Sequence, residues 1–270
     1  MHKWMLKAAL AFVLTVCWSS TSVATTANMS AETLFIDVSS LQAGTVTIGY
    51  DIRFSKKRHK LMIVKGDKVY TYDLDPARTS ETFPLQSGGG TYEITWAEHK
   101  SGTTYRKLGT TSIDLPDSGA DQVFLGSVQN VNWKESQKAT ALAAKLTATL
   151  KTDGDKARAI HEYVTANIVY EDKETPVAYL PSVDDTLISG KGMCYDYASL
   201  MAVMLRSVGI PTKLVMGSTT YVTEYHAWNE IFLDGKWVIV DVTVDAAYKQ
   251  AGKSIPFAKE SSKYTVQKVY

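Results

Sequence analysis

A cysteine, a histidine and an aspartate in the second half of the chain have the types and order of a nucleophilic catalytic triad. Cys194 follows a loop with two glycines, and apolar residues then recur at helical spacing up to Gly209-Ile210-Pro211. We therefore place Cys194 at or near a helix N-terminus. The helix dipole and unpaired N–H groups there favour the thiolate, which is the nucleophilic form. The alternative interpretation is a small apolar core residue.

The predicted base and acid come from one β-hairpin. Two apolar runs flank Asp234-Gly235, a dipeptide typical of a two-residue type I′ turn. In the register that this turn sets, Trp228 lies opposite Asp241. Because side chains alternate along a strand, His226 and Asp241 then share one face as diagonal neighbours, roughly 7 to 8 Å apart at the backbone. This spacing allows a hydrogen bond between imidazole and carboxylate.

The three residues have distinct expected roles. Cys194 attacks, His226 takes and returns the proton, and Asp241 orients the imidazole and stabilises its cation. Taken singly, His226 also fits a satisfied histidine on a half-buried strand, and Asp241 fits a carboxylate that caps a turn. A slip of one residue in the hairpin would place the two on opposite faces. His161 competes as a base, but no acid with defined geometry lies near it in sequence, so we expect it at the surface or at a boundary.

Four ordered sequence blocks resemble the core of the bacterial transglutaminase-like superfamily. The blocks are Gly-Lys-Gly-Met-Cys-Tyr-Asp-Tyr-Ala at 190–198, Leu-Arg-Ser-Val-Gly-Ile-Pro at 205–211, His-Ala-Trp-Asn-Glu at 226–230, and 237–243 around the aspartate. The resemblance spans roughly residues 155–245. It implies a papain-like fold and carries the family's catalytic residues onto Cys194, His226 and Asp241. Val242 is a departure, since relatives usually have a proline after the aspartate.

The first 24 residues have the features of a secretory signal peptide. Lys3 and Lys7 precede an apolar run over 8–18, and small residues follow it. The run is too short to span a bilayer, so we expect a secreted or cell-surface protein with no stable membrane insertion after cleavage. Cleavage would remove Cys17 and leave Cys194 without a disulfide partner. In an exported protein, such a thiol favours catalysis over packing.

Charge and composition argue against several classes of function. The formal net charge is +1, and it becomes about −1 when Lys3 and Lys7 leave with the signal peptide. A nearly neutral chain has no general attraction for nucleic acid or for anionic membranes. One dense basic run lies at 56–60, which we interpret as a solvated hairpin tip, with contact to anionic cell-wall polymer as the alternative. The sequence has no metal-ligand spacing and no phosphate loop, so we expect no metal and no cofactor.

The pattern along the chain predicts two domains. Residues 30–117 contain short strand-like runs separated by turn signals, which is typical of an antiparallel β-sandwich of immunoglobulin-like type. Residues 120–270 form the predicted catalytic domain, in which an amphipathic helix precedes another that Asp153 or Asp155 caps. Residues 246–270 contain no motif. The predicted fold class is α+β, with a transglutaminase-like, papain-like core preceded by the sandwich.

Together these features predict an exported transglutaminase-like cysteine enzyme. It transfers acyl groups from peptide or glutamine amides through a Cys194 thioester, and the outcome is protein cross-linking or hydrolysis. The expected substrate is a protein or peptide, with cell-wall peptide as a candidate. The alternatives are a cysteine peptidase or amidase acting on cell-wall peptides, a non-catalytic surface binding module, and an assembly factor whose cross-linking acts only locally. The sequence names no second donor for the oxyanion.

Overall fold

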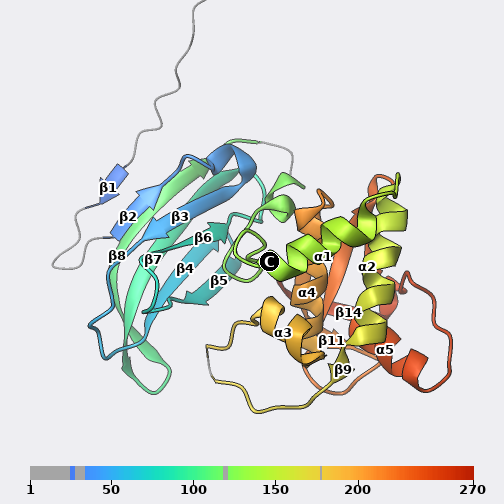
Figure 1. Cartoon of the computed structure of the whole chain (residues 1–270). Coiled ribbons are helices and arrows are strands. Elements are labelled where there is room, and N and C mark those ends of the chain that lie inside the picture. Colours follow the sequence, from blue (N-terminus) through green and yellow to red (C-terminus); the bar gives the residue numbers. More distant parts are fainter. Residues whose placement is uncertain (1–24, 28–33, 118–120, 177) are drawn as a thin grey trace, which may run out of the picture.

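The computed structural model describes residues 25–27, 34–117, 121–176 and 178–270. A β-sandwich lies beside a part built of mixed helices and strands (Figure 1). The predicted signal peptide, residues 1–24, lies outside the described residues. Within the described ranges, no helix is long and apolar enough to cross a membrane.

The sandwich consists of two antiparallel four-stranded sheets. One sheet has the order β1-β2-β3-β6 and the other has the order β5-β4-β7-β8. The elements are β1 (Thr25–Ala27), β2 (Leu34–Asp37), the short 3-10 helix η1 (Leu41–Ala43), β3 (Thr45–Gly49), β4 (His59–Lys65), β5 (Lys68–Asp73), β6 (Ser80–Pro84), β7 (Gly90–Ser101) and β8 (Thr104–Leu115). Alternating apolar side chains, among them Ile48, Leu61 and Trp96, are buried in the core. The antiparallel sheets match the prediction for 30–117, whereas the immunoglobulin-like type stays a prediction.

The basic run at 56–60 is not a hairpin tip. It lies between β3 and β4, which belong to different sheets, and its last two residues begin β4. His59 is buried, and its Nδ1 accepts a hydrogen bond from the indole N–H of Trp96 at 3.2 Å. Lys57 pairs with Glu98 at 2.8 Å. The prediction of a hairpin tip was wrong because the chain crosses between sheets here. Residues 56–58 are exposed as expected, whereas His59 turns into the core.

The second part of the chain contains five α-helices, two short 3-10 helices and a four-stranded antiparallel sheet among its described residues. The elements are η2 (Gln122–Leu125), α1 (Gln137–Thr147), α2 (Asp153–Asn167), β9 (Val169–Tyr170), α3 (Val183–Ser189), β10 (Lys191–Gly192), α4 (Cys194–Ser207), β11 (Thr212–Thr219), β12 (His226–Leu233), β13 (Lys236–Val240), α5 (Val242–Gln250), η3 (Ser261–Lys263) and β14 (Tyr264–Val269). The cap of α2 is Thr152, which accepts from the N–H of Asp155 at 3.1 Å, and not one of the two predicted aspartates. Threonine performs the same capping as aspartate, so the predicted helix forms at the expected place.

Helix α4 is the centre of this part. Every residue from Asp196 to Arg206 is buried. Helices α1, α2 and α3 pack on α4 together with β11 and β12 (Figure 1). A helix covered on all sides has little freedom to shift or rotate, because each face is held by close-packed neighbours. The packing therefore fixes the position of Cys194, the first residue of α4.

The hairpin of β12 and β13 has the predicted turn and register. Asp234 and Gly235 have φ values of 50° and 77°, as a type I′ turn requires. The paired residues end with Asn229 opposite Val240. Asp241 follows directly and caps α5 instead of extending the strand. The prediction of the register is confirmed.

The C-terminal segment without a motif completes the sheet. Strand β14 pairs antiparallel with β11, and the sheet has the order β13-β12-β11-β14. Its first residue, Tyr264, is buried. The segment therefore belongs to the framework of the second part, a role that its sequence did not reveal.

Arg206, in the last turn of α4, ties distant segments to this helix. Its guanidinium donates to the carbonyl oxygens of Thr212, Gly126 and Tyr270, each at 2.8 Å. The side chain is buried, and this burial lowers the pKa of Arg206 to about 9. A planar group with five N–H donors suits three carbonyls in different directions. The cost of burying the charge is thus offset by three hydrogen bonds to backbone acceptors.

We expect Arg206→Met to destabilise the protein strongly. Loss of the guanidinium leaves three carbonyls without this donor, and an unsatisfied buried polar group costs about 1–3 kcal/mol. The free energy of unfolding, measured by urea denaturation, should fall by about 3 kcal/mol or more. The control is Arg53→Met, which removes a half-exposed ion pair with Asp51 and should cause no measurable change. Equal stability of the Arg206 and Arg53 variants would contradict the role of Arg206.

Candidate active site

Cys194 lies at the N-terminus of α4, as the sequence predicts. It is partly exposed, and it is a free thiol. The short parallel pair of β9 and β10 leads the chain into the helix. Gly192 is required there, because a Cβ at this position would lie 2.6 Å from the Cβ of Asp196. The close approach brings the chain into the first turn, where the backbone N–H groups have no acceptor within the helix.

A buried carboxylate holds the start of α4 in place. Asp196 Oδ2 accepts the N–H of Met193, the residue before the cysteine, at 2.8 Å. The hydroxyl of Tyr179 donates to Oδ1, and the ammonium of Lys173 lies 3.3 Å from Oδ2. Asp196 is fully buried. Tyr179 and Lys173 were not expected at this site, since the loop that carries them has no motif.

His226 and Asp241 form the expected pair. Nε2 of His226 lies 2.9 Å from Oδ2 of Asp241. The two side chains are 3% and 0% exposed, so water does not compete for this contact. With Nε2 engaged by the carboxylate, Nδ1 is the ring nitrogen left to face the Cys194 thiol, whose proximity contributes to the raised pKa of His226. The structure thus brings all three predicted residues together, and their catalytic roles stay a prediction.

Asp241 accepts two further hydrogen bonds. Its Oδ1 accepts the N–H of Val244 at 3.1 Å, which is the cap of α5. Its Oδ2 accepts from the hydroxyl of Tyr264 at 2.9 Å. Burial and the charge of Asp241 raise the pKa of Tyr264, so the phenol keeps its proton and acts as a donor. Tyr264 was missed by the sequence analysis, because nothing links it to Asp241 until β14 joins the sheet.

The imidazole of His226 is electrostatically suited to be a cation. Burial lowers its pKa, but the hydrogen bonds and negative charges of Asp241 and Cys194 outweigh this and raise the pKa to about 9. The ring of Trp228 stacks nearby, with centroids 6.4 Å apart and planes 20° apart. At neutral pH the arrangement therefore favours an imidazolium beside Cys194.

His161 has an acid partner that its sequence neighbours do not supply. Its Nε2 lies 2.8 Å from Oδ2 of Asp245 on α5, and Lys259 pairs with the same carboxylate at 2.8 Å. His161 is partly buried, as expected for a boundary residue, and its acid could not be found from the sequence because Asp245 lies 84 positions away. Neither cavity beside Cys194 is lined by His161. The second histidine–carboxylate pair therefore lies apart from the thiol.

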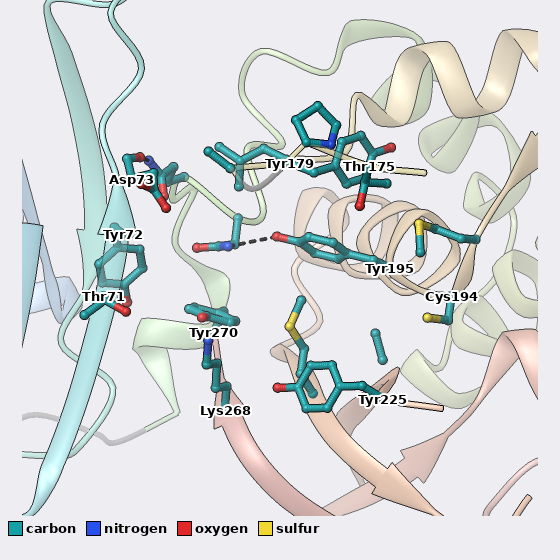
Figure 2. A pocket seen from close by; sticks show the side chains of 18 of the residues that line it. Thr71, Tyr72, Asp73, Thr175, Tyr179, Cys194, Tyr195, Tyr225, Lys268 and Tyr270 are labelled. Carbon is teal, nitrogen blue, oxygen red and sulfur yellow. Dashed lines mark hydrogen bonds between the residues drawn. The ribbon is translucent and has the colours of Figure 1, made fainter. Parts of the chain in front are cut away.

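Two cavities meet at the thiol. The first, of about 400 Å³, lies between β5, β14 and the loop that contains Tyr179 (Figure 2). The second, of about 410 Å³, is lined by Tyr170 and by residues of α5. Cys194, His226 and Tyr225 line both. Tyr170, on the short strand β9 that follows α2, thus lies at the rim of the site, and the thiol is accessible from two sides.

Among the described residues, no group of three or more histidine, cysteine, aspartate or glutamate side chains is arranged to hold a metal ion. The groups that the site does contain support nucleophilic chemistry. A thiol at a helix N-terminus, an imidazole and a buried carboxylate can form a covalent acyl intermediate on sulfur. The N–H groups at the start of α4 can stabilise the oxyanion.

We expect Asp241→Asn to lower the pKa of His226 below about 9. The carboxylate raises this pKa through its hydrogen bond and its charge, and asparagine supplies no negative charge. The imidazole should then lose its proton at a lower pH than in the wild type. An NMR titration of isotope-labelled histidine rings measures this directly, with the Asp245→Asn variant as control because it removes the other histidine's acid. An unchanged titration of His226 in Asp241→Asn would show that Asp241 does not stabilise the cation.

Known proteins share parts of this chain. Residues 140–242 match the family model of the transglutaminase-like superfamily. YebA of Bacillus subtilis is 34% identical over 183 residues, which is 58% of this chain and 25% of YebA. The human kyphoscoliosis peptidase is 29% identical over 116 residues, which is 38% of this chain and 17% of the peptidase. The chain thus spans a quarter or less of the length of these two relatives.

Among solved structures, the periplasmic domain of TgpA from Pseudomonas aeruginosa is similar to 84% of this chain over 96% of its own length, with 14% identity and a TM-score of 0.42. The matched residues 140–242 contain Cys194, His226 and Asp241. They also contain α4 and the hairpin of β12 and β13, which position the three side chains. This part of the chain belongs to the transglutaminase-like superfamily.

Proposed function

We propose that the protein is an exported cysteine enzyme that transfers acyl groups from peptide or glutamine amides through a thioester on Cys194. The observation that carries the proposal is a partly exposed thiol at a helix N-terminus, beside an imidazole that a buried carboxylate holds at 2.9 Å. Export is supported by the signal-peptide features of residues 1–24. Protein or peptide substrates are supported by the family match.

The first half of the proposed reaction forms the thioester. The thiolate sulfur of Cys194 attacks the amide carbonyl carbon, and the electron pair of the C=O bond moves onto oxygen. N–H groups at the start of α4, including that of Cys194, stabilise this oxyanion. The C–N bond then breaks, and the imidazolium of His226 gives its proton to the departing amine. Asp241 keeps the ring oriented while its charge changes.

The second half releases the acyl group. Neutral His226 takes a proton from an incoming amine or water, which attacks the thioester carbonyl, and the C–S bond breaks to restore the thiolate. An amine acceptor produces a cross-link, whereas water produces deamidation or peptide hydrolysis. The second cavity supports an acceptor site distinct from the donor site, and Asp172 and Glu224 on its lining favour an ammonium-bearing group. The name of the human relative supports a peptidase as the second candidate function.

The proposal predicts a change in the mass of the peptide substrate that depends on both Cys194 and His226. The mature protein is incubated with glutamine-containing peptides, with and without a primary amine, and intact masses are measured. Addition of the amine to a peptide would identify acyl transfer, whereas conversion of amide to acid or backbone cleavage would identify hydrolysis. Cys194→Ala and His226→Gln should abolish either reaction, because one lacks the nucleophile and the other the proton carrier.

The matched control for the histidine is His161→Gln, which should retain activity because His161 lies outside both cavities. Full activity of Cys194→Ala would refute the proposed nucleophile. Identical behaviour of wild type and Cys194→Ala, with peptides bound but unchanged, would support the non-catalytic binding module instead.

The pH dependence of the first step follows from His226. The leaving amine takes its proton from the imidazolium, and this form is lost as the pH rises through about 9. The rate of thioester formation should therefore fall on the alkaline side with a midpoint near this value. Single-turnover kinetics with an activity-selected peptide between neutral and alkaline pH provide the measurement. A rate that keeps rising well above pH 9 would mean that His226 is not the acid.

A further inference from the structure

The first cavity exposes the edge of a β-sheet next to the thiol. Strand β5 is the outer strand of its sheet and pairs only with β4 among the described strands. Leu74 donates its N–H to the carbonyl of His59 on the β4 side at 3.0 Å. Because backbone groups alternate in an antiparallel pair, Tyr72 also bonds toward β4, whereas Thr71 and Asp73 present their backbone groups to the other side.

That other side faces the cavity. The carbonyl of Asp73 accepts a hydrogen bond from the side chain of Gln129 at 2.7 Å, which confirms its outward direction and closes the edge at this point. No described residue bonds to the outward N–H and C=O of Thr71. Thr71, Tyr72 and Asp73 line the same cavity as Cys194 (Figure 2). An unpaired donor and acceptor on an edge strand are what an added strand requires.

The side chain of Asp73 has an acceptor without a partner. Its Oδ2 pairs with Lys60 at 3.3 Å. Its Oδ1 is buried and has no hydrogen-bond partner among the described residues. An ionised carboxylate oxygen can only accept, so a matching ligand must bring an N–H or O–H donor. A positively charged donor forms the strongest such bond.

The charged residues that line the cavity favour the basic group of a ligand at the β5 end. Besides His226, the charged residues on the lining are Asp73 on β5 and Lys268 on β14, and Figure 2 shows them on separate strands. Lys268 is exposed and repels a second cation from its own end of the cavity. A basic group therefore finds its carboxylate partner on the β5 side, where it would share Asp73 with Lys60 by binding Oδ1.

We propose that the outer edge of β5 binds an extended segment of the acyl-donor substrate as an added strand, and that Asp73 selects a lysine-like or arginine-like side chain on this segment. The assignment of the ligand as the acyl donor rests on the proposed function. The sandwich then contributes directly to substrate selection, through backbone pairing at Thr71 and side-chain recognition at Asp73. The cavity of about 400 Å³ is of the size that ligand sites commonly have, roughly 300–1,000 Å³.

The first test measures the side-chain preference. Short glutamine-containing peptides carry one lysine at successive positions, and each is matched by a peptide with norleucine, which has no ammonium. Binding is measured by fluorescence anisotropy with the Cys194→Ala protein, so that no peptide is consumed. At one position lysine should bind about tenfold more tightly than norleucine. In Cys194→Ala with Asp73→Asn, the lysine-to-norleucine ratio should fall to about one. A preference absent from the first protein, or retained in the second, would overturn the selection by Asp73.

The second test measures the backbone pairing. Thr71→Pro removes the outward N–H without touching a bond to β4, and it should weaken peptide binding about tenfold. Val69→Pro is the matched control, because Val69 has the same outward orientation on β5 but does not line the cavity. Peptides with N-methylated backbones test the same pairing without altering the protein, and methylation should weaken binding at alternate positions. Equal effects of the two proline variants, together with no alternation, would exclude strand addition.

The outcomes separate this inference from the proposed function. If the wild type changes no peptide but the Cys194→Ala protein shows the lysine preference and the alternation, the enzyme proposal fails and the binding edge stands. If the wild type turns over peptides without either pattern, the binding edge fails and the enzyme proposal stands.

Discussion

The buried carboxylate of Asp241 holds together the groups on which the site depends. Its oxygens form hydrogen bonds with a ring nitrogen from β12, a hydroxyl from β14 and a backbone N–H from α5. A buried charge is stable only when its oxygens are well supplied with donors, so the fold must bring these three elements to one point. The positions of β14 and α5 and the orientation of His226 therefore all depend on the need to supply donors to this one carboxylate.

Helix α4 imposes the complementary constraint on the nucleophile. Close packing around its circumference fixes the helix, and Asp196 ties its first turn to the preceding residue and to the loop of Tyr179. At the opposite end, Arg206 binds the carbonyls of Gly126 and Tyr270. The thiol is thus placed by buried contacts at both ends of one helix, which is how a reactive group can be held without help from its substrate.

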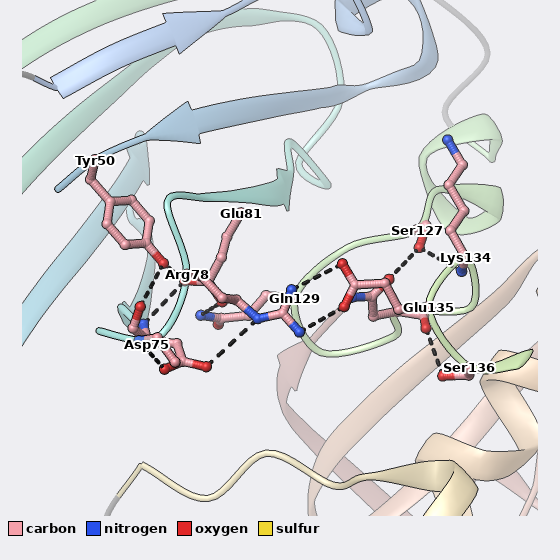
Figure 3. A network of polar contacts seen from close by, with 11 residues as sticks. Tyr50, Asp75, Arg78, Glu81, Ser127, Gln129, Lys134, Glu135 and Ser136 are labelled. Atoms are coloured by element: carbon pink, nitrogen blue, oxygen red, sulfur yellow. Dashed lines mark hydrogen bonds and ion pairs between the residues drawn. The ribbon is translucent and has the colours of Figure 1, made fainter. Parts of the chain in front are cut away.

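The seam between the sandwich and the second part contains a second polar network. Glu81 of β6 accepts from the hydroxyl of Tyr50 at 2.5 Å and from the side chain of Gln129 at 2.9 Å (Figure 3). Burial raises the pKa of Glu81. Arg78 reaches Glu135 through two hydrogen bonds of 3.0 and 2.7 Å. Gln129 is the same residue that bonds the carbonyl of Asp73, so this network and the edge of β5 share a member.

Local patterns account for most of what the sequence predicted. The type I′ turn and the register of the hairpin follow from a dipeptide and an alternation within a few residues, and Cys194 at a helix start follows from glycines and helical spacing. These features suffice to bring His226 and Asp241 together. The bonds of Asp241 to Tyr264 and of His161 to Asp245 join residues 23 and 84 positions apart, and no periodicity reports such contacts. The crossing of the basic run between two sheets was missed for the same reason, since it depends on how the sheets stack.

Because the turn at Asp234-Gly235 has only two residues, the catalytic geometry depends on the number of residues in the hairpin as much as on their types. A single inserted or deleted residue there would shift the pairing of β12 and β13 by one position and turn the Asp241 side chain to the other face of the sheet. Such a chain could keep every other residue unchanged, and the site would still lose its acid. Insertions in this architecture are therefore tolerable in the loops that leave the pairing alone, whereas the spacing from His226 to Asp241 admits almost none.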